Sequence, residues 1–341
     1  MPTQRLTSER PPPRRALIIQ TAYLGDTVFT SALAAAFRKR WPECELELCV
    51  SPRGRDVALA MPGVTAAHVF DKRGADKGFS GLKRMAARLR ERGFDLAILP
   101  HRSLRTGLLA RLAGIPERIG FAGAAGSLFY TQRVRSTAKG FLAQEADLAR
   151  AVDAQPAEML LQPRPEWLHE AREALGSCGN EKLAAICLGS EWATKIWPAE
   201  RVTGLLRLLT RGDLRPVLLG GPRERELAAR IARAGGACVD TTGNPVGEAL
   251  AILSMSSLCV GGDTGLVHAA RALGVPTVAV FGPTDPGMHV FGPRQRAVSL
   301  QLACAPCSAH GSAKCPLGHH RCLRDLPPEK VEQACQAVLL T

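Results

Sequence analysis

Residues 261–286 read GGDTGLVHAARALGVPTVAVFGPTDP, and this stretch indicates the fold class. An apolar strand ends at Gly261 and Gly262, a helical pattern follows, and Thr277–Val280 is the next apolar run. A strand, a tight glycine turn, a helix and a second strand make a βαβ unit, which joins parallel strands. The start of the helix offers unpaired N–H groups and a positive dipole end, so this corner suits a pyrophosphate or sugar hydroxyls.

Further residues of the corner are candidate ligand contacts. Gly265, like the glycines before it, lets the backbone approach a ligand closely. Asp263 carries a negative charge that repels phosphate, so we expect it to face sugar hydroxyls. The alternative is that Asp263 or Thr264 only caps the helix. His268 lies one helical turn after Thr264 on the same side, although a lone helical histidine is usually structural.

The same alternation of short apolar runs and amphipathic helical patterns extends over most of the chain. Continuous apolar strands joined by helices predict parallel sheets that are covered on both faces. The expected strands are Ala16–Ile19, Leu46–Val50, Ala66–Phe70, Leu96–Leu99, Ala184–Leu188, Val217–Leu219, Leu258–Val260 and Thr277–Val280. The expected helices are Thr27–Arg40, Leu82–Arg92, Ser103–Ala113, Ala199–Thr210, Glu224–Ala234, Val246–Leu253, Leu266–Leu273 and 327–340.

The length of 341 residues predicts two domains. A proline-bearing, weakly patterned stretch at Ala154–Pro165 is the expected linker. We therefore expect two Rossmann-like α/β domains, over residues 16–155 and 166–326, that face a central cleft, and a C-terminal helical segment over 327–341. Residues 1–15 are polar and proline-rich without the apolar core of a secretory signal, so they are expected to form a disordered leader.

Composition and charge limit the function classes. An apolar fraction of 46% with 22% charged residues fits a globular chain, and no run approaches the ~18 apolar residues of a membrane helix, so we expect a cytoplasmic protein. Residues 1–155 hold 25 Lys and Arg against 14 Asp and Glu, whereas 156–341 hold 19 against 17. The basic first half predicts an anionic partner there, namely nucleic acid, an acidic membrane face or a phosphorylated substrate. The alternative is a basic surface that only aids solubility.

Three segments together resemble one protein family. DTGLVHAARALGVPTVAVFGPTDP at 263–286 closely resembles the signature of the bacterial ADP-heptose:lipopolysaccharide heptosyltransferases, glycosyltransferase family 9. LIIQTAYLGDTVFTSALAAAFRKRWP at 17–42 resembles the family's N-terminal strand, loop and helix, and GSEWATKIWPAE at 189–200 resembles its Lys-x-Trp-Pro-x-Glu loop. The resemblance covers about residues 16–340. It implies a GT-B fold, with the acceptor on the first domain and the nucleotide sugar on the second.

The resemblance also implies the reaction. Asp26 would be the general base that takes the proton from the acceptor hydroxyl as it attacks the anomeric carbon, which requires a carboxylate with a suitably raised pKa. The residues alone favour a helix cap for Asp26. A single displacement inverts the anomeric configuration. The chain has no Asp-x-Asp metal motif, so neither a catalytic metal nor another cofactor is implied.

Donor contacts carry over residue by residue. Lys195 matches the lysine that contacts the donor phosphates, where a fixed cation stabilises the departing nucleoside diphosphate, while a plain surface lysine is the alternative. Ser190 is a candidate phosphate contact from the same loop. Glu224 matches an acidic residue that holds the ribose, with Glu226 as the alternative, since a first-turn glutamate also suits the helix dipole. The donor sugar–phosphate loop is Asp263, Thr264, Gly265 and His268.

The acceptor implied by the resemblance is the growing lipopolysaccharide core, an anionic saccharide on a lipid. We therefore expect a peripheral enzyme at the inner face of the inner membrane. Basic side chains of the first half are candidate contacts for acceptor carboxylates and phosphates or for the membrane, with Arg102 and Arg105 foremost. The wider set adds Arg111, Arg118, Arg133 and Arg135.

Four of the eleven cysteines form the pattern Cys304-x2-Cys307-x7-Cys315-x6-Cys322. Four thiolates at such spacing can hold one tetrahedral Zn²⁺, so the segment is a candidate structural zinc site, with unliganded thiols as the alternative.

Two other functions stay open. A related GT-B transferase would use another nucleotide sugar or acceptor. A basic zinc-containing nucleic-acid-binding protein would account for the charge and the cysteines. These features lie at opposite ends of the chain, however, so we expect no nucleic-acid partner.

Overall fold

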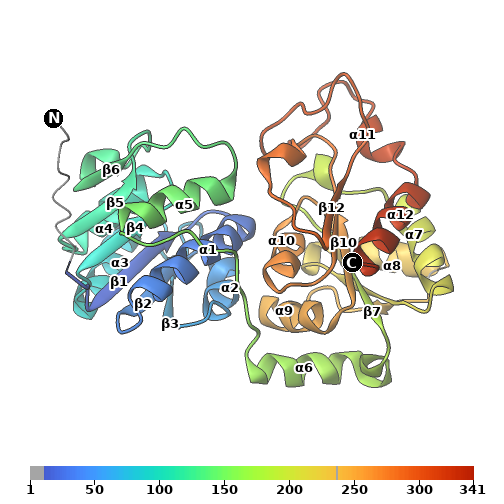
Figure 1. The fold of residues 1–341 in the computed structure, drawn as a ribbon, viewed down its shortest axis with the longest axis horizontal. Coiled ribbons are helices and arrows are strands. Elements are labelled where there is room, and N and C mark those ends of the chain that lie inside the picture. The colour runs from blue at the N-terminus through green and yellow to red at the C-terminus, as the bar shows by residue number, and fades with distance from the viewer. Residues whose placement is uncertain (1–10, 236) are drawn as a thin grey trace, which may run out of the picture. The chain divides into compact units, whose positions relative to one another are not determined.

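Two parallel sheets of the same topology form the framework of the protein (Figure 1). The computed structural model describes residues 11–235 and 237–341, and the chain divides into two compact units, Met1–Met159 and Leu160–Thr341. The first sheet has the order β3-β2-β1-β4-β5-β6 and the second the order β12-β11-β10-β7-β8-β9. Both are doubly wound, with a topological switch point between β1 and β4 in the first unit and between β7 and β10 in the second. The expected α/β class with two Rossmann-like units is confirmed.

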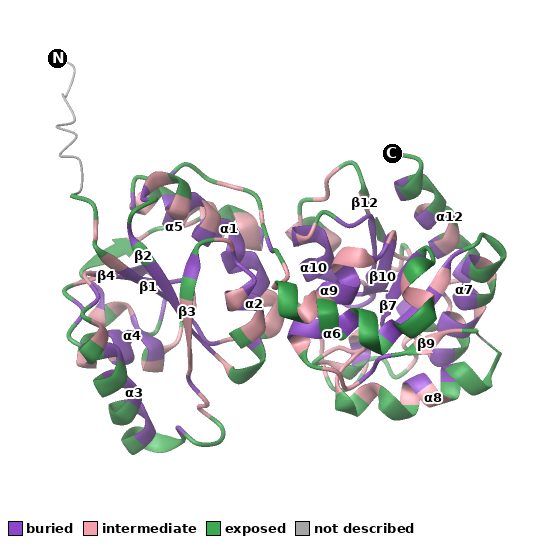
Figure 2. Cartoon of the chain, turned by 90° about the horizontal axis from the view of Figure 1, so that it is seen from below, coloured by how far each residue is buried: buried purple, intermediate pink, exposed green. Residues whose placement is uncertain are grey.

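The first unit buries its central strands under helices that are apolar on one side and polar on the other (Figure 2). Helix α3, for example, buries Leu82, Met85 and Leu89, which recur at the spacing of one helix face. The strands are β1 (Arg15–Gln20), β2 (Glu45–Val50), β3 (Val64–Val69), β4 (Leu96–Leu99), β5 (Glu117–Phe121) and β6 (Gln132–Val134). The helices are α1 (Leu24–Arg40), α2 (Arg55–Leu59), α3 (Gly78–Arg92), α4 (Leu104–Leu112) and α5 (Phe141–Ala151).

The second unit repeats this plan. Its core is built from apolar strand residues such as Ile186, Leu218 and Val260, which pack against α7 and α12. The strands are β7 (Leu183–Cys187), β8 (Arg215–Leu219), β9 (Val239–Asp240), β10 (Leu258–Gly262), β11 (Thr277–Val280) and β12 (Gln295–Val298). The helices are α6 (Pro165–Leu175), α7 (Ala199–Arg211), α8 (Arg225–Arg233), α9 (Val246–Met255), α10 (Gly265–Ala272), α11 (Arg321–Arg324) and α12 (Pro328–Leu339). No helix in the described part of the chain has both the length and the apolar composition to cross a bilayer.

Every strand and helix expected from the sequence is present, but several elements were not foreseen. The edge strands β6 and β12 are short and start with polar residues, Gln-Arg, so they lack an apolar run. Strands β5 and β9 and helices α2, α5, α6 and α11 were missed as well. Of the expected leader, residues 1–10 lie outside the described residues, and Arg15 already belongs to β1.

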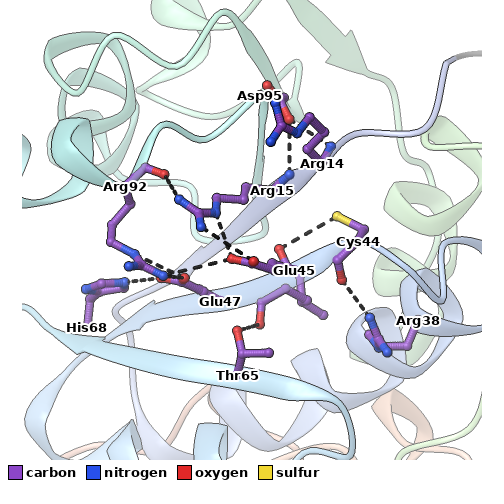
Figure 3. Close-up of polar contacts among 11 residues, drawn as sticks. Arg14, Arg15, Arg38, Cys44, Glu45, Glu47, Thr65, His68, Arg92 and Asp95 are labelled. Atoms are coloured by element: carbon purple, nitrogen blue, oxygen red, sulfur yellow. Dashed lines mark hydrogen bonds and ion pairs between the residues drawn. The ribbon is translucent and has the colours of Figure 1, made fainter.

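A buried carboxylate links three elements of the first unit (Figure 3). Glu47 on β2 is fully buried, and its carboxylate binds Nε2 of His68 at 2.5 Å and the guanidinium of Arg92. Burial alone raises the pKa of Glu47, but the hydrogen bonds from Arg92 and His68 outweigh burial and hold the pKa below its ordinary value. Glu47 is therefore ionised in the folded protein and ties β2 to β3 and α3.

Replacing Glu47 tests the contribution of this cluster. We expect Glu47→Gln to lower the free energy of unfolding near neutral pH by about 1–3 kcal/mol, because charge-assisted hydrogen bonds are lost. Since the pKa of Glu47 is depressed on folding, its stabilisation is present above the ordinary value of 4.5 and disappears as the pH falls through the folded-state value. Urea denaturation at neutral and acidic pH measures both effects.

The matched control is Glu45→Gln on the same strand. The side chain of Glu45 is 47% exposed and pairs with Arg15, so its loss is expected to cost less than about 1 kcal/mol. Equal losses in the two variants would contradict the assigned role of Glu47.

Candidate functional site

The candidate site of the second unit lies at its switch point, where β7 and β10 end. The loop after β7 carries Ser190 and a turn, Ala193–Lys195, and the loop after β10 carries Asp263. The structure joins these loops, because Nζ of Lys195 lies 2.6 Å from Oδ2 of Asp263. Carboxyl ends of strands at a switch point are where doubly wound sheets bind ligands. The sequence named both residues but did not foresee that they contact each other.

Asp263 is the centre of a buried polar network. Oδ2 also accepts a hydrogen bond from the Thr284 hydroxyl at 2.8 Å, and Oδ1 lies 3.0 Å from Nε2 of His268 and 3.6 Å from Nε2 of His289. Burial alone raises the pKa of Asp263, but His268 and Lys195 outweigh it and hold the pKa far below its usual range. The carboxylate is thus ionised, and both oxygens are engaged by the protein. Thr264 is the N-cap residue of α10, and its side chain makes no capping bond.

His268 connects Asp263 to a buried arginine. Nη1 of Arg271 lies 3.1 Å from Nδ1 of His268, and because a guanidinium only donates, Nδ1 must accept. The proton of neutral His268 is therefore on Nε2, where it is donated to Asp263. Burial lowers the pKa of His268, which agrees with a neutral ring. Arg271 is fixed in turn by Oε1 of Gln295 at 2.9 Å and lies over the Phe291 ring.

The glycines at the end of β10 serve close packing inside the unit. A Cβ added to Gly262 would lie 2.6 Å from the carbonyl oxygen of Lys195, and one added to Gly261 would meet Cys187 and Val267. The close backbone approach inferred from the sequence is therefore, at these two positions, an approach of β10 to neighbouring protein. It sets the distance between the strand end and the turn that carries Lys195.

The cysteine-rich segment 301–322 makes hydrogen bonds to two of the loops that carry this network. The Thr194 hydroxyl donates to the carbonyl of Ser312 at 2.8 Å, and the Ser312 N–H donates back to it at 2.9 Å. Nε2 of His320 lies 2.8 Å from the carbonyl oxygen of Thr194. The N–H groups of Cys307 and Ser308 both donate to the carbonyl of Pro283, next to Thr284. The segment thus holds the Lys195 turn and the Thr284 loop together.

The four cysteines of this segment lie close enough for their charges to interact. Burial, and then the charges of neighbouring cysteines, raise the pKa of Cys307 and Cys322. The thiol of Cys315 instead has a lowered pKa, first because the N–H of His320 bonds to it. Among the described residues, the group whose possible ligand atoms all lie within 4.8 Å of one another is Asp263, His268 and His289. The four sulfurs are not gathered as tightly.

Glu224 and Ser190 lie together at the edge of the same site. Glu224 ends a short turn, Pro222–Glu224, and its Oε2 accepts the N–H of Gly221 at 2.7 Å. A Cβ added to Gly189 would lie 2.7 Å from Cδ of Glu224, so this carboxylate rests against the start of the Ser190 loop. Glu226, the alternative ribose contact, is exposed on α8. The geometry therefore favours Glu224 over Glu226.

In the first unit, Asp26 lies beside the switch point, in the first turn of α1. The helix begins at Leu24, three residues before the expected Thr27, because Tyr23 acts as the N-cap residue. Oδ2 of Asp26 accepts the N–H of Tyr23 at 3.1 Å, so Asp26 contributes to capping from the third position of the helix and not as the N-cap residue that the residues alone favoured. The side chain is partly exposed. A capping role and a catalytic role are compatible here.

Two residues near Asp26 were missed by sequence reasoning. Nζ of Lys72 donates to the carbonyl of Thr21 at 2.8 Å, and the Thr21 hydroxyl lies 3.1 Å from Nδ1 of His101. Burial, and then the charge of Lys72, lower the pKa of His101 to about 4. His101 directly follows β4 and Pro100, so the switch-point rule applied to the sequence was a usable signal for it. Lys72 belongs to no motif, and only the fold brings it to Thr21.

The predicted acceptor arginines differ in their surroundings. The Arg102 guanidinium lies over the Phe121 ring at 4.1 Å and donates to Oε1 of Gln144 at 3.2 Å. Burial, and then the charge of Arg105, lower the pKa of Lys72, so Arg105 lies near that lysine. Two arginines of the wider set also hold loops within the unit. The guanidinium of Arg118 donates to the main-chain carbonyl of Phe129 at 2.6 Å and that of Arg133 to the main-chain carbonyl of Ser127 at 2.9 Å.

Comparisons with known proteins identify the family of this chain. Residues 82–317 match the family "Glycosyltransferase family 9 (heptosyltransferase)". The chain is 25% identical to lipopolysaccharide heptosyltransferase 2 of Escherichia coli K12, covering 96% of this chain and 99% of that protein. It is 29% identical to lipopolysaccharide heptosyltransferase 1 of Pseudomonas aeruginosa, covering 96% and 98%.

A solved structure, that of the E. coli ADP-heptose lipopolysaccharide heptosyltransferase II, has the same fold. It superimposes with a TM-score of 0.78 at 22% identity, over 96% of this chain and 98% of that one. The two units therefore form a GT-B fold, as the sequence resemblance implied. The chain belongs to glycosyltransferase family 9, the heptosyltransferases.

The packing at Gly262 can be tested directly. We expect Gly262→Ala to lower the free energy of unfolding by about 1–3 kcal/mol, because the added methyl group meets the backbone of Lys195, which cannot move away as a flexible side chain can. Denaturant unfolding measures the change. The control is Gly212→Ala, where a Cβ would lie 3.5 Å from the carbonyl of Leu209, an ordinary contact. Its expected change is within about 0.5 kcal/mol, and a similar loss in both variants would contradict the packing role.

Proposed function

We propose that this enzyme transfers heptose from ADP-heptose to the inner core of lipopolysaccharide, with inversion at the anomeric carbon. The observation that carries the proposal is the Lys195–Asp263 pair at the switch point of the second unit, inside the family's signature segments. The relatives named above, heptosyltransferases that act on lipopolysaccharide, support the choice of sugar and acceptor. The E. coli structure, described as an ADP-heptose enzyme, supports the choice of donor.

In the proposed donor site, the second unit stabilises the leaving group. Bond breaking places negative charge on the departing ADP, and a cation held in position before the reaction lowers the barrier. Asp263 holds Lys195 in one place, and the start of α10 at Thr264 and Gly265 adds N–H groups of the kind that bind phosphate. Ser190 would contact a phosphate, and Glu224 the ribose hydroxyls.

In the proposed chemical step, the acceptor oxygen forms a bond to the anomeric carbon of the heptose. Asp26 takes the proton of that hydroxyl, and the electron pair of the breaking bond leaves with ADP. No metal ion takes part in this scheme. The cluster of Asp263, His268 and His289 is a poor cation site, because the Lys195 ammonium already lies 2.6 Å from Asp263 and Arg271 contacts His268.

The acceptor and location are proposed from the first unit. Its basic excess suits an anionic, lipid-linked saccharide, with Arg102 and Arg105 as contacts for carboxylates or phosphates. An acceptor on a lipid requires the enzyme to work at a membrane surface, so we propose a peripheral enzyme at the cytoplasmic face of the inner membrane.

Turnover with defined substrates tests the proposal. The purified protein is incubated with ADP-heptose and lipopolysaccharide acceptors truncated before the heptoses, and both ADP release and the glycosylated product are measured. We expect ADP release that depends on the acceptor, with a product of inverted configuration. ADP-glucose in place of ADP-heptose distinguishes a relative with another donor. Absence of turnover, together with absence of ADP binding in calorimetry, refutes the proposal.

A second variant tests the proposed base. We expect Asp26→Asn to lower kcat by about 10²- to 10⁴-fold, because the amide cannot accept the proton, while the affinity for ADP stays unchanged. The amide oxygen can still accept the N–H of Tyr23, so the helix start is retained. The control is Asp147→Asn on α5, where the carboxylate pairs with Arg150 one turn along the same helix. Near-normal turnover of Asp26→Asn removes it from the base role.

We also propose that Cys304, Cys307, Cys315 and Cys322 hold a structural metal ion, with zinc as the first candidate. The pKa of Cys307 and of Cys322 is raised first by burial and then by the charges of other cysteines of this set, and a bound cation would relieve that repulsion. Backbone N–H groups directed at Cys315 favour its thiolate, the form that binds metal. The ion would fix the segment that braces Thr194 and would take no part in the transfer.

Metal analysis tests this second proposal. We expect about one metal ion per purified chain. A Cys304→Ser/Cys307→Ser double variant should lose the ion and unfold more easily, while Cys178→Ser, which lies outside the segment, should keep it. Protein without stoichiometric metal, and with unchanged stability in the double variant, rules the proposal out.

A further inference from the structure

Glu145 on α5 is a buried acid that the proposed transfer step does not use. The residue is only 7% exposed, and its Oε2 has no hydrogen-bond partner. Within the described part of the chain, no cation pairs with it. A buried carboxylate without a compensating charge is costly, so a neutral, protonated form is favoured.

Glu145 is linked to the backbone of Asp26 by one hydroxyl. Helices α1 and α5 pack together, with the rings of Phe29 and Phe141 stacked at 4.9 Å. Oγ1 of Thr30 lies 3.2 Å from Oε1 of Glu145 and 3.0 Å from the main-chain oxygen of Asp26. These contacts form a path from α5 through α1 to the turn that carries the proposed base.

The Thr30 hydroxyl has a single hydrogen, so it can donate to only one of these two oxygens at a time. The Asp26 carbonyl can only accept, so Thr30 bonds to it only by donating. Thr30 also accepts a hydrogen bond from Nε2 of Gln20 at 3.3 Å, and because a hydroxyl can accept two bonds, all three contacts are satisfied at once if Glu145 is protonated and donates to Thr30. If Glu145 is ionised, Thr30 can donate to Glu145 or to the Asp26 carbonyl, but not to both.

Charges around Glu145 also favour its protonated form. Burial raises the pKa of Glu145 to about 8, the bond with Thr30 opposes the rise, and the negative charge of Asp26 adds to it. Helix α5 packs against α1, β5 and β6. The arginines of β5 and β6, Arg118 and Arg133, donate to main-chain carbonyls, and Arg150 on α5 itself pairs with Asp147, so none of them pairs with Glu145.

We propose that Glu145 is a positioning residue for Asp26: protonated, it donates to Thr30, which donates to the Asp26 carbonyl and fixes the first turn of α1. The inference rests on the proposed function, because it concerns the base of that reaction. When Glu145 ionises, Thr30 turns toward it, the turn loses one bond and a negative charge appears near Asp26. The rate of heptose transfer therefore decreases at alkaline pH.

The experiment compares pH profiles of kcat for wild type, Glu145→Gln and Glu145→Leu. We expect kcat of the wild type to fall on the alkaline side with a midpoint near pH 8, where Glu145 ionises. Glu145→Gln keeps a donor for Thr30 and cannot ionise, so it should retain kcat at neutral pH within about twofold and lose the alkaline fall. Glu145→Leu cannot donate and should lose about ten- to a hundredfold in kcat with an unchanged KM for the donor.

The matched control is Glu248→Gln on α9. Glu248 is also buried, at 8% exposed, with a pKa raised by burial, but it belongs to the second unit. It should leave the alkaline fall of the wild type in place. An alkaline fall that persists in Glu145→Gln, or a normal kcat in folded Glu145→Leu, overturns the inference while transfer by the wild type still supports the proposed function.

Unfolding measured against pH gives a readout that needs no turnover. Because the pKa of Glu145 is raised on folding, the unfolded chain releases this proton first. The wild type should thus lose stability relative to Glu145→Gln as the pH rises from about 4.5 towards 8. A difference in the free energy of unfolding between wild type and Glu145→Gln that does not change with pH overturns the inference. Absence of transfer by the wild type refutes the proposed function separately.

Discussion

The second unit depends on a negative charge held almost out of reach of water. Asp263 is 7% exposed, and a carboxylate so placed is tolerated only when its partners replace the water it has lost. Lys195 and Thr284 do so from two separate loops, and His268 does so from helix α10. Their positions are therefore mutually constrained, and Gly262 has no side chain because one would separate the pair. The ion pair that offsets the cost of burying the Asp263 carboxylate also holds the Lys195 ammonium in one place.

Whether the sequence predicts a feature of this structure depends on how far apart in the chain the interacting residues lie. Strands such as Leu96–Leu99 and Thr277–Val280 were placed correctly because each is an unbroken apolar run. Edge strands such as β6 were missed, since their stability comes from pairing with a neighbour and not from their own composition. Residues 263–286 identified the family through a contiguous pattern. The ion pair joins residues 68 positions apart, which no local pattern records.

In the first unit the sequence named Asp26 as the candidate base but did not reveal its surroundings. Its motif, Leu-Gly-Asp, is local, whereas Glu145 and Lys72 come from distant segments and belong to no pattern. Helix α5, which carries Glu145, was itself not foreseen. The supporting residues of a site are thus harder to predict than the reacting ones, because their role is defined by packing. Charge alone made Arg118 and Arg133 candidates, and only the structure shows that their guanidinium groups also bond to loop carbonyls.

The bonds between Thr194 and Ser312 have a consequence for the order in which the protein is made. These residues are 118 positions apart, and the segment around Ser312 follows β12, the last strand of the sheet. A growing chain that has left the ribosome only as far as β12 holds all six strands that the structure describes in this sheet, but the Lys195 turn still lacks its bonds to Ser312 and the sheet still lacks α12. The turn that carries Lys195 is therefore fixed late in synthesis. A translation product that stops before Ser312 would lose both the bonds that hold this turn and the apolar residues of α12, such as Val331 and Val338, that pack in the core.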